Sequence, residues 1–275
     1  MSGILNKQKD RFNEIDFLKG LAIITMITSH VFYFKYQMNM ASLDFNSSWY
    51  VFLTLFAQII FITCIGINLS LSYQNTIKIK EQKKLMENNN INFKDKYWVK
   101  QIKRVIIIGI FALILSFLTY LTHGYKFVKF GILHFASVAI FIMMWSVKSN
   151  ILNILIFIFI LTLYYFKNNI SSFLITSNIH PIVGFITGLG YSPYYSMDYF
   201  SLVPWISLIS IGVLIGNIAY KKYKRRYPIP TTVTSFIDNN PFSKLVRTFG
   251  KYSFFIYLIH IPILFTILSI IKKMS

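Results

Sequence analysis

Three ionisable side chains lie in the first apolar stretch of the chain: Asp16, Lys19 and His30. At about 100° and 1.5 Å per residue, a helix would place Lys19 and His30 on one face, roughly 16 Å apart. Asp16, three residues before Lys19, would be able to pair with it. Because charge within an apolar span is costly, these positions indicate a binding or catalytic site. The plainer alternative is that Lys19 reaches the lipid headgroups, Asp16 neutralises it and His30 packs with a hydrogen bond.

Two further side chains suggest acid–base chemistry. His134 stands near the start of a later apolar run, and Asp198 is the only Asp or Glu between Asp95 and Asp238. With the N-terminus inside, His30, His134 and Asp198 all fall in the outer half of the membrane. An apolar pocket with two imidazoles and one carboxylate can orient a neutral histidine as a general base, worth roughly 10² to 10⁴ in rate.

The composition indicates a membrane protein. The 275 residues are 55% hydrophobic and 13% charged, with a mean hydropathy of +0.55, which exceeds what a soluble core needs. Lys and Arg outnumber Asp and Glu by 28 to 9, but the cations cluster between uncharged runs, which favours an anionic leaflet over nucleic acid as the partner. The single Cys64 excludes an internal disulfide and a cysteine-based metal site, and we expect no metal. The polar stretch up to Glu14 predicts no removable signal peptide.

Cutting the sequence at its charges predicts an all-α, multi-pass transmembrane helical bundle of about seven spans in one domain, residues 1–275. Each predicted span has about 20 mostly apolar residues, and the runs do not alternate as barrel strands do. The predicted spans are Ile15–Tyr36, Tyr50–Tyr73, Val105–Thr122, Phe130–Val147, Asn150–Phe166, Leu202–Tyr220 and Tyr252–Ile271.

The distribution of cations predicts the orientation. With the N-terminus cytoplasmic, 22 of the 28 basic residues lie inside and six outside. The segments 77–104 and 221–249 are then basic cytoplasmic loops. Residues 168–200 are interpreted as an outer loop that is able to re-enter the membrane, since Pro181 and Pro193 interrupt its apolar runs. Whether the segment re-enters or spans the membrane stays open, although a full span would move the basic segment 221–249 outside. The expected location is the cell membrane.

Several segments resemble one family in order along the chain. The run 15–23, followed by His30, resembles the opening helix of the heparan-alpha-glucosaminide N-acetyltransferase catalytic-domain family in its short prokaryotic form. The spacing of Lys19, ten residues and His30 is similar to the Arg, ten residues, His signature of the wider transmembrane acyltransferase group, with Lys in place of Arg. Further similar segments are 61–73, Phe130 to His134, Asp198 to Trp205 and Gly250 to Pro262.

This resemblance implies transfer of an acetyl group from cytoplasmic acetyl-CoA to an amino-sugar or glycan acceptor on the outer side. His30 would act either as a general base or as a covalent acyl relay, and the sequence does not choose between them. His134 or Asp198 would orient the imidazole or bind the acceptor. Lys19, with Asp16 beside it, would bind coenzyme A phosphates at the inner end, about one pantetheine length from His30.

Other cations at the inner surface are candidates for the same phosphates. Arg104, Arg247 and Lys251 are expected there, although a positive-inside role is the stronger explanation for them. A rival hypothesis is a small proton-coupled transporter or flippase of an anionic or glycolipid substrate, in which Lys19 and Asp16 gate and the histidines relay protons. The missing internal repeat disfavours it. A structural subunit without catalysis is a third alternative. The acceptor, N- or O-acylation and the oligomeric state, which includes a homo-oligomer, stay open.

Overall fold

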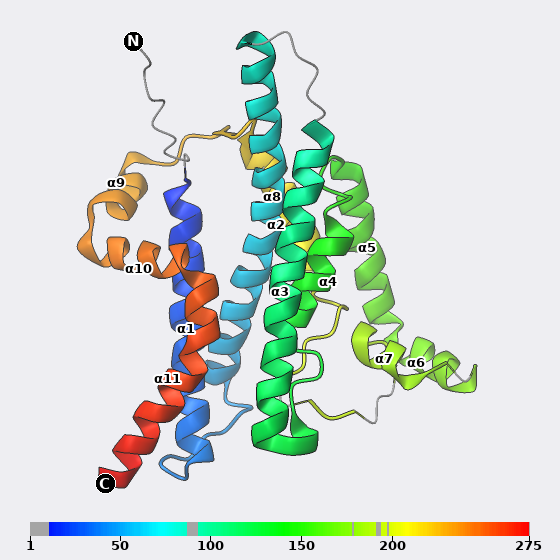
Figure 1. The fold of residues 1–275 in the computed structure, drawn as a ribbon, viewed down its shortest axis with the longest axis vertical. Helices are drawn as coiled ribbons and strands as arrows, with labels where there is room; N and C mark the ends of the chain where they lie inside the picture. The colour runs from blue at the N-terminus through cyan, green and yellow to red at the C-terminus, as the bar shows by residue number, and fades with distance from the viewer. Residues whose placement is uncertain (1–10, 87–92, 178, 191–193, 197, 275) are drawn as a thin grey trace. The chain divides into compact units, whose positions relative to one another are not determined.

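The computed structural model describes residues 11–86, 93–177, 179–190, 194–196 and 198–274, and within this part the fold is all-α (Figure 1). The chain divides into two compact units. Unit 1 comprises Met1–Phe61 and Pro228–Ser275, and unit 2 comprises Ile62–Tyr227. Each unit is described separately below.

Unit 1 is built on α1 (Asn13–Gln37), the first part of α2 (Ser48–Met86), and three C-terminal helices. These are α9 (Thr231–Asn239), α10 (Pro241–Lys251) and α11 (Ser253–Met274). Both α10 and α11 pack on α1. Asn240 caps the N-terminus of α10, because its side-chain oxygen accepts from the backbone nitrogen of Phe242 at 2.8 Å. Pro241 is the first residue of the helix, where no N–H is needed.

Unit 2 contains the rest of α2 together with α3 (Phe93–His123), α4 (Ile132–Met143), α5 (Asn150–Tyr165), α6 (Lys167–Thr176), α7 (Pro181–Thr187) and α8 (Ile206–Ala219). The short 3-10 turn Gly124–Lys126 follows α3, and a small hairpin of β1 (Tyr220–Lys221) and β2 (Lys224–Arg225) follows α8. The helices α3, α4 and α5 run in alternating directions (Figure 1). Alternation is the arrangement that successive membrane crossings require.

The helices α2 and α8 approach closely through small residues. A β-carbon on Gly66 would overlap the carbonyl oxygen of Ile209, and one on Gly212 would overlap that of Thr63. One turn farther along, Ser70 Oγ donates to Asn217 Oδ1 at 2.6 Å. Glycines that admit a neighbouring backbone, and polar side chains that bond between helices, are typical of packing within membranes.

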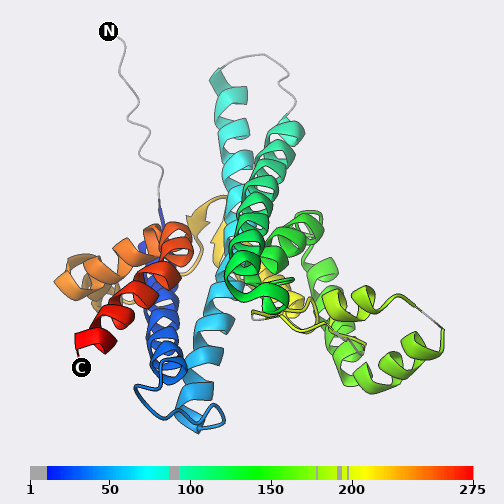
Figure 2. The same ribbon diagram turned by 60° about the horizontal axis from the view of Figure 1, so that its bottom comes forward.

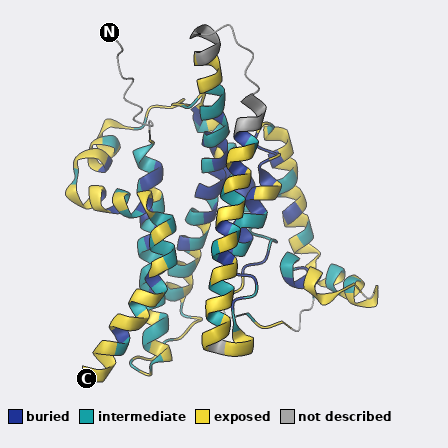
Figure 3. Ribbon diagram, viewed as in Figure 1, coloured by how far each residue is buried: buried dark blue, intermediate teal, exposed yellow. Residues whose placement is uncertain are grey.

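The outer face of α3 is apolar and exposed, as the yellow ribbon in Figure 3 shows. Five side chains at helical spacing are each at least half exposed: Ile106, Ile110, Leu113, Phe117 and Leu121. A continuous apolar stripe of this size is costly in water but is the normal surface of a helix in lipid.

Of the seven predicted spans, four correspond to long apolar helices. Within the described residues, α1, α2, α3 and α11 are long and apolar enough to cross a membrane. The pair α5 and α6 passes the same test together but is bent by 71° (Figure 2), so it is either one broken span or a re-entrant loop. The count by length is therefore four, or five with the bent pair, and not seven.

The two remaining predicted spans are shorter helices, α4 and α8, of 12 and 14 residues. At 1.5 Å per residue they extend about 18 and 21 Å, less than the roughly 30 Å of hydrocarbon. Their apolar residues are largely buried, among them Phe135, Ile140, Ile209 and Val213, each fully covered. The sequence runs that predicted spans here include the flanking irregular residues, and an apolar run alone does not distinguish burial in protein from burial in lipid.

The two basic segments expected to be loops also differ from that prediction. Helix α2 continues to Met86 and α3 begins at Phe93, so the described part of 77–104 is helical; residues 87–92 lie outside the described part. Segment 221–249 contains a β-hairpin and the helices α9 and α10. Segment 168–200 contains most of α6 and all of α7. Polar residues at helical spacing continue a helix beyond the bilayer as readily as they form a loop.

Candidate active site

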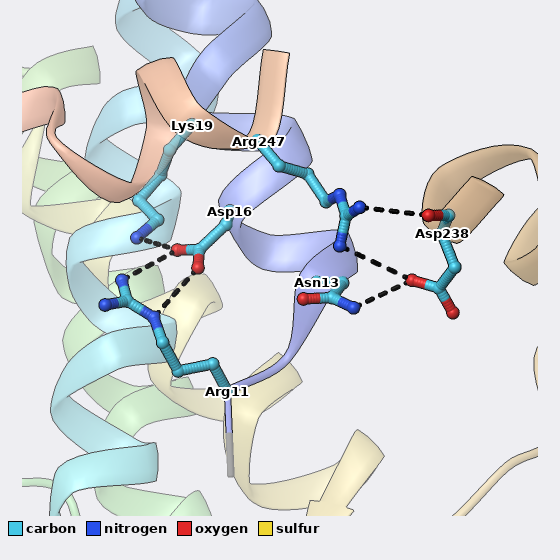
Figure 4. Close-up of polar contacts among 6 residues, drawn as sticks. All are labelled: Arg11, Asn13, Asp16, Lys19, Asp238 and Arg247. Carbon is cyan, nitrogen blue, oxygen red and sulfur yellow. Dashed lines mark hydrogen bonds and ion pairs between the residues drawn. The ribbon is translucent and has the colours of Figure 1, made fainter. Parts of the chain in front are cut away.

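The first turns of α1 carry a buried ion-pair cluster (Figure 4). Lys19 Nζ lies 2.6 Å from Asp16 Oδ1, and Arg11 Nε lies 3.0 Å from Asp16 Oδ2. The Asp16 and Lys19 side chains are only 10% and 13% exposed, so the pair is held in a largely dry environment. The pairing expected from the three-residue spacing is present. Arg11, which sequence reasoning did not include, adds a second cation to the same carboxylate.

The packing of α10 fixes this end of α1. A β-carbon on Gly250 would overlap the carbonyl oxygen of Asp16, and a β-carbon on Gly20 would overlap that of Val246. Only glycine permits such an approach of one helix backbone to another. The residue that carries the carboxylate is therefore held by backbone contact from a helix more than 200 positions later in the chain.

About three turns beyond Lys19 on α1, His30 contacts a second imidazole, that of His260 in α11. The ring centroids are 5.0 Å apart and the planes are inclined by 73°, an edge-to-face contact. His260 is 4% exposed. In the sequence His260 falls within the family-like segment Gly250 to Pro262, and nothing there places it with His30. That pairing depends on α11 packing along α1, which spacing within one helix cannot predict.

The hydrogen bonds of the two rings define their tautomers. His30 Nδ1 lies 2.8 Å from the carbonyl oxygen of Met26, and His260 Nδ1 lies 2.6 Å from that of Tyr257. Because a carbonyl oxygen can only accept, each Nδ1 is the donor. In the neutral rings Nε2 is then the basic nitrogen. His260 Nε2 is buried and has no hydrogen-bond partner, which leaves an acceptor whose desolvation is not offset.

His134, in unit 2, has the opposite tautomer. Its Nδ1 accepts from the backbone nitrogen of Gly131 at 3.3 Å, so its Nε2 carries the proton and donates to Ser116 Oγ at 3.2 Å. Ser116 in turn donates to the carbonyl oxygen of Val128 at 2.6 Å. Both ring nitrogens therefore bond to groups that hold the start of α4 against α3.

Asp198 supports the same helix end. Its Oδ2 accepts from the backbone nitrogen of Ile132 at 3.2 Å, and a β-carbon on Gly131 would overlap that oxygen. A carboxylate at a helix N-terminus satisfies an otherwise unpaired N–H and stabilises the helix dipole. His134 and Asp198 thus lie together in unit 2, whereas His30 belongs to unit 1. A catalytic part for either of them stays a prediction.

The other candidate phosphate ligands occupy three settings. Arg104 is half-buried on α3, seven residues after the buried Tyr97, on nearly the same helix face. Arg247 is 19% exposed, and its Nη2 donates to the Asp238 carbonyl oxygen at 3.1 Å. Lys251 is exposed, with Nζ 5.1 Å from the centroid of the Tyr252 ring. Arg247 is accordingly committed to a protein partner, and Lys251 is the more accessible cation.

Among the described residues, no group of three or more His, Cys, Asp or Glu side chains is arranged to bind a metal ion.

Comparison with known proteins identifies the family. A family model described as heparan-alpha-glucosaminide N-acetyltransferase, catalytic, matches residues 11–262. The match includes the cluster at Asp16 and both imidazoles. A search of curated proteins and a search of solved structures return no significant match. The chain therefore belongs to the heparan-alpha-glucosaminide N-acetyltransferase catalytic-domain family, and this membership implies a membrane acetyltransferase that uses acetyl-CoA as donor.

Proposed function

We propose that the chain moves an acetyl group from cytoplasmic acetyl-CoA to an amino-sugar or glycan acceptor on the outer side of the membrane. The observation that supports this proposal best is the contact between the imidazoles of His30 and His260. His30 lies on α1, the helix that also carries the Asp16 and Lys19 cluster. A basic nitrogen and a set of cations are the two features that acyl transfer from a phosphorylated thioester requires.

The cationic end of α1 is the proposed site for the phosphates of coenzyme A. Asp16 holds Arg11 and Lys19 at 3.0 and 2.6 Å, so two cations share one carboxylate and the cluster keeps a net positive charge. Donors already oriented by a carboxylate lose less conformational entropy when an anion binds. Arg104, Arg247 and Lys251 are proposed as supplementary ligands, with Lys251 the most accessible.

Toward the other end of α1, His30 Nε2 is the proposed general base, the atom that takes up a proton during the reaction. As the acceptor amine or hydroxyl attacks the thioester carbonyl carbon, its proton passes to Nε2. The carbon–sulfur bond then breaks, and the coenzyme A thiolate takes that proton as it leaves. The bond from Nδ1 to the Met26 carbonyl holds the ring in the tautomer that this step needs.

The same geometry permits the alternative in which His30 Nε2 attacks the thioester first. The carbon–sulfur bond would then break, coenzyme A would leave as the thiolate, and the acetyl group would be carried on Nε2 while Nδ1–H still donates to the Met26 carbonyl oxygen. The acceptor would next attack the acetyl carbonyl carbon, which breaks the bond to Nε2, and its proton would pass to the coenzyme A thiolate. In either case His260 is proposed as a positioning residue, because its ring contacts that of His30 edge to face. His134 and Asp198 are proposed to shape the acceptor side through α4.

The test is an acetyl-transfer assay with the purified full chain. Labelled acetyl-CoA is supplied with a panel of amino sugars and glycans, and both coenzyme A release and labelled acceptor are measured. We expect transfer to at least one acceptor, and His30→Ala should lower it about 10² to 10⁴-fold while coenzyme A binding is retained.

Two controls separate the alternatives. His180→Ala, at an exposed histidine, should leave transfer unchanged. A labelled acetyl group that stays on the protein after acid quench, and is absent in His30→Ala, would favour the relay. Full activity of His30→Ala would remove His30 from the mechanism, and no release with any acceptor would favour the transporter hypothesis.

A further inference from the structure

Helix α10 has three distinct faces, of which one is buried within unit 1. The buried face consists of Ser243, Val246 and Gly250. Two rows flank it: an apolar row of Phe242, Leu245 and Phe249, and a basic row of Lys244, Arg247 and Lys251. At 100° per residue, the apolar row is centred about 100° to one side of the buried face and the basic row about 100° to the other. Phe242 and Leu245 are 59% and 55% exposed, unusual for large apolar side chains without a partner.

The buried face rests across α1. Gly250 contacts the backbone of Asp16, and Val246 contacts Gly20. Figure 1 shows α10 crossing the N-terminal half of α1 instead of running along it. Because the two rows lie on opposite sides of the contact face of a crossing helix, they must point in opposite directions along the α1 axis.

The direction in which each row points follows from two hydrogen bonds that connect Arg247 to the start of α1 through Asp238. Arg247, in the basic row, donates to the carbonyl oxygen of Asp238, and the Asp238 carboxylate accepts from Asn13 Nδ2 at 2.7 Å (Figure 4). Asn13 is the first residue of α1. The basic row therefore faces the N-terminal end of α1. The apolar row faces the other way, along the remaining length of α1.

Since α1 is a candidate membrane span, this geometry has a direct consequence for α10. A helix that lies across the start of a span lies along the bilayer surface. Its apolar row then points toward the hydrocarbon, and its basic row toward the headgroups and water. Helix α10 contains three cations and no Asp or Glu, and the preceding α9 adds the exposed apolar side chains of Val233 and Phe236.

We propose that α10, with α9, is an interfacial helix that binds the anionic phospholipids of the cytoplasmic leaflet. An amphipathic helix with cations on one face and Phe and Leu on the other is suited to this position, and acidic lipid headgroups complement its charge. The inference does not depend on the acetyl-transfer reaction. Its occupant is the lipid surface, and not a second protein chain.

Spin labels on single cysteines test the depth of each row. In a Cys64→Ala background, labels are placed separately at Phe242, Leu245 and Lys244 of the full chain in phosphatidylcholine vesicles containing phosphatidylglycerol. Thermal unfolding first selects labelled variants that fold like the parent. Labels at Phe242 and Leu245 should be more accessible to oxygen than to a water-soluble nickel chelate, and the label at Lys244 should show the reverse. Equal accessibility of the two rows to the nickel chelate would overturn the proposal.

A second arm tests the lipid charge. Replacing phosphatidylglycerol by phosphatidylcholine should move the Leu245 label outward, and adding inorganic phosphate to neutral vesicles should not restore its depth. Lys244→Glu should weaken the effect of the anionic lipid, while Lys167→Glu, at an exposed lysine outside α10, should not. A Leu245 label that lies at the same depth in both lipids would contradict the proposed binding of anionic phospholipids. Dipolar broadening between Leu245 labels on two chains would show a second copy covering this face and would also overturn it.

Discussion

At the residue scale, the tautomer of a histidine separates a candidate base from a structural side chain. His30 and His260 donate through Nδ1 to carbonyls of their own helices, which leaves Nε2 as the basic atom. His134 instead accepts at Nδ1 and donates from Nε2, so both of its nitrogens support the start of α4. The three residues are equivalent in the sequence, and only their partners distinguish them.

The contact between the two rings leads to a prediction for His260. If its nitrogen contributes to the reaction, His260→Phe and His260→Ala should both lower kcat by about tenfold or more, with little change in KM for acetyl-CoA. If only edge-to-face packing matters, His260→Phe should keep near-normal activity and His260→Ala should not, because Phe retains the ring. Steady-state kinetics of the two variants distinguish these outcomes. Unchanged kcat in both would exclude His260 from positioning His30.

The ion-pair cluster leads to a second prediction. Lys19→Gln should raise KM for acetyl-CoA by about tenfold, since one charge-assisted hydrogen bond is worth about 1.5–3 kcal/mol, while KM for the acceptor should hardly change. Binding of coenzyme A measured by calorimetry should weaken in parallel. Lys126→Gln, at an exposed lysine after α3, is the matched control. Equal weakening of donor and acceptor would refute the phosphate assignment.

At the element scale, short apolar runs are the limit of what the sequence could predict. The long runs gave α1 and α11 close to their predicted bounds, because a run of about 20 apolar residues has one natural solution in lipid. They gave only the apolar parts of α2 and α3, since α2 continues to Met86 and α3 already begins at Phe93. The runs at α4 and α8 were also found as helices, but their length and burial could not be read from hydropathy. The contact of His30 with His260 likewise depends on which helices pack together, a property of the fold and not of spacing.

The crossing of α10 over α1 gives a prediction at this scale. Gly250→Val should destabilise the protein by about 1–3 kcal/mol, because the added carbons would overlap the carbonyl of Asp16. The same change should also weaken coenzyme A binding, since Asp16 holds Arg11 and Lys19. Thermal unfolding in detergent and calorimetry measure the two effects.

The control for this substitution is Gly109→Ala on α3. A β-carbon there would lie 3.3 Å from the Ser137 hydroxyl, a contact that a side chain can relieve by a small movement. Alanine is also the better helix former, by about 1 kcal/mol. We therefore expect no loss of stability at Gly109. Comparable losses at both positions would mean that the close approach of α10 to α1 is not a specific constraint.

At the scale of the whole molecule, the number of membrane crossings depends on whether α4 and α8 cross. Both the charge asymmetry and the alternating directions of α3, α4 and α5 bear on that number. Twenty-two of 28 cations fall on the predicted cytoplasmic side. The short helices α4 and α8 count as crossings in that scheme, although each is too short to span by itself. If they did not return the chain across the membrane, the side on which later segments lie would change.

Labelling of single cysteines from outside the cell tests whether α4 and α8 cross the membrane. In the Cys64→Ala background, cysteine is placed at Ser42, Ser177 or Thr231, each exposed. A membrane-impermeant maleimide should label positions 42 and 177 on intact cells, and position 231 only after lysis, because the basic segment 221–249 is retained inside. Labelling of 177 only after lysis would mean that either α4 or the bent pair of α5 and α6 does not cross. Labelling of 231 on intact cells, with 177 also labelled, would mean that α8 does not cross. Helices α9 and α10 would then lie at the outer leaflet, and the cations of α10 would not be on the coenzyme A side.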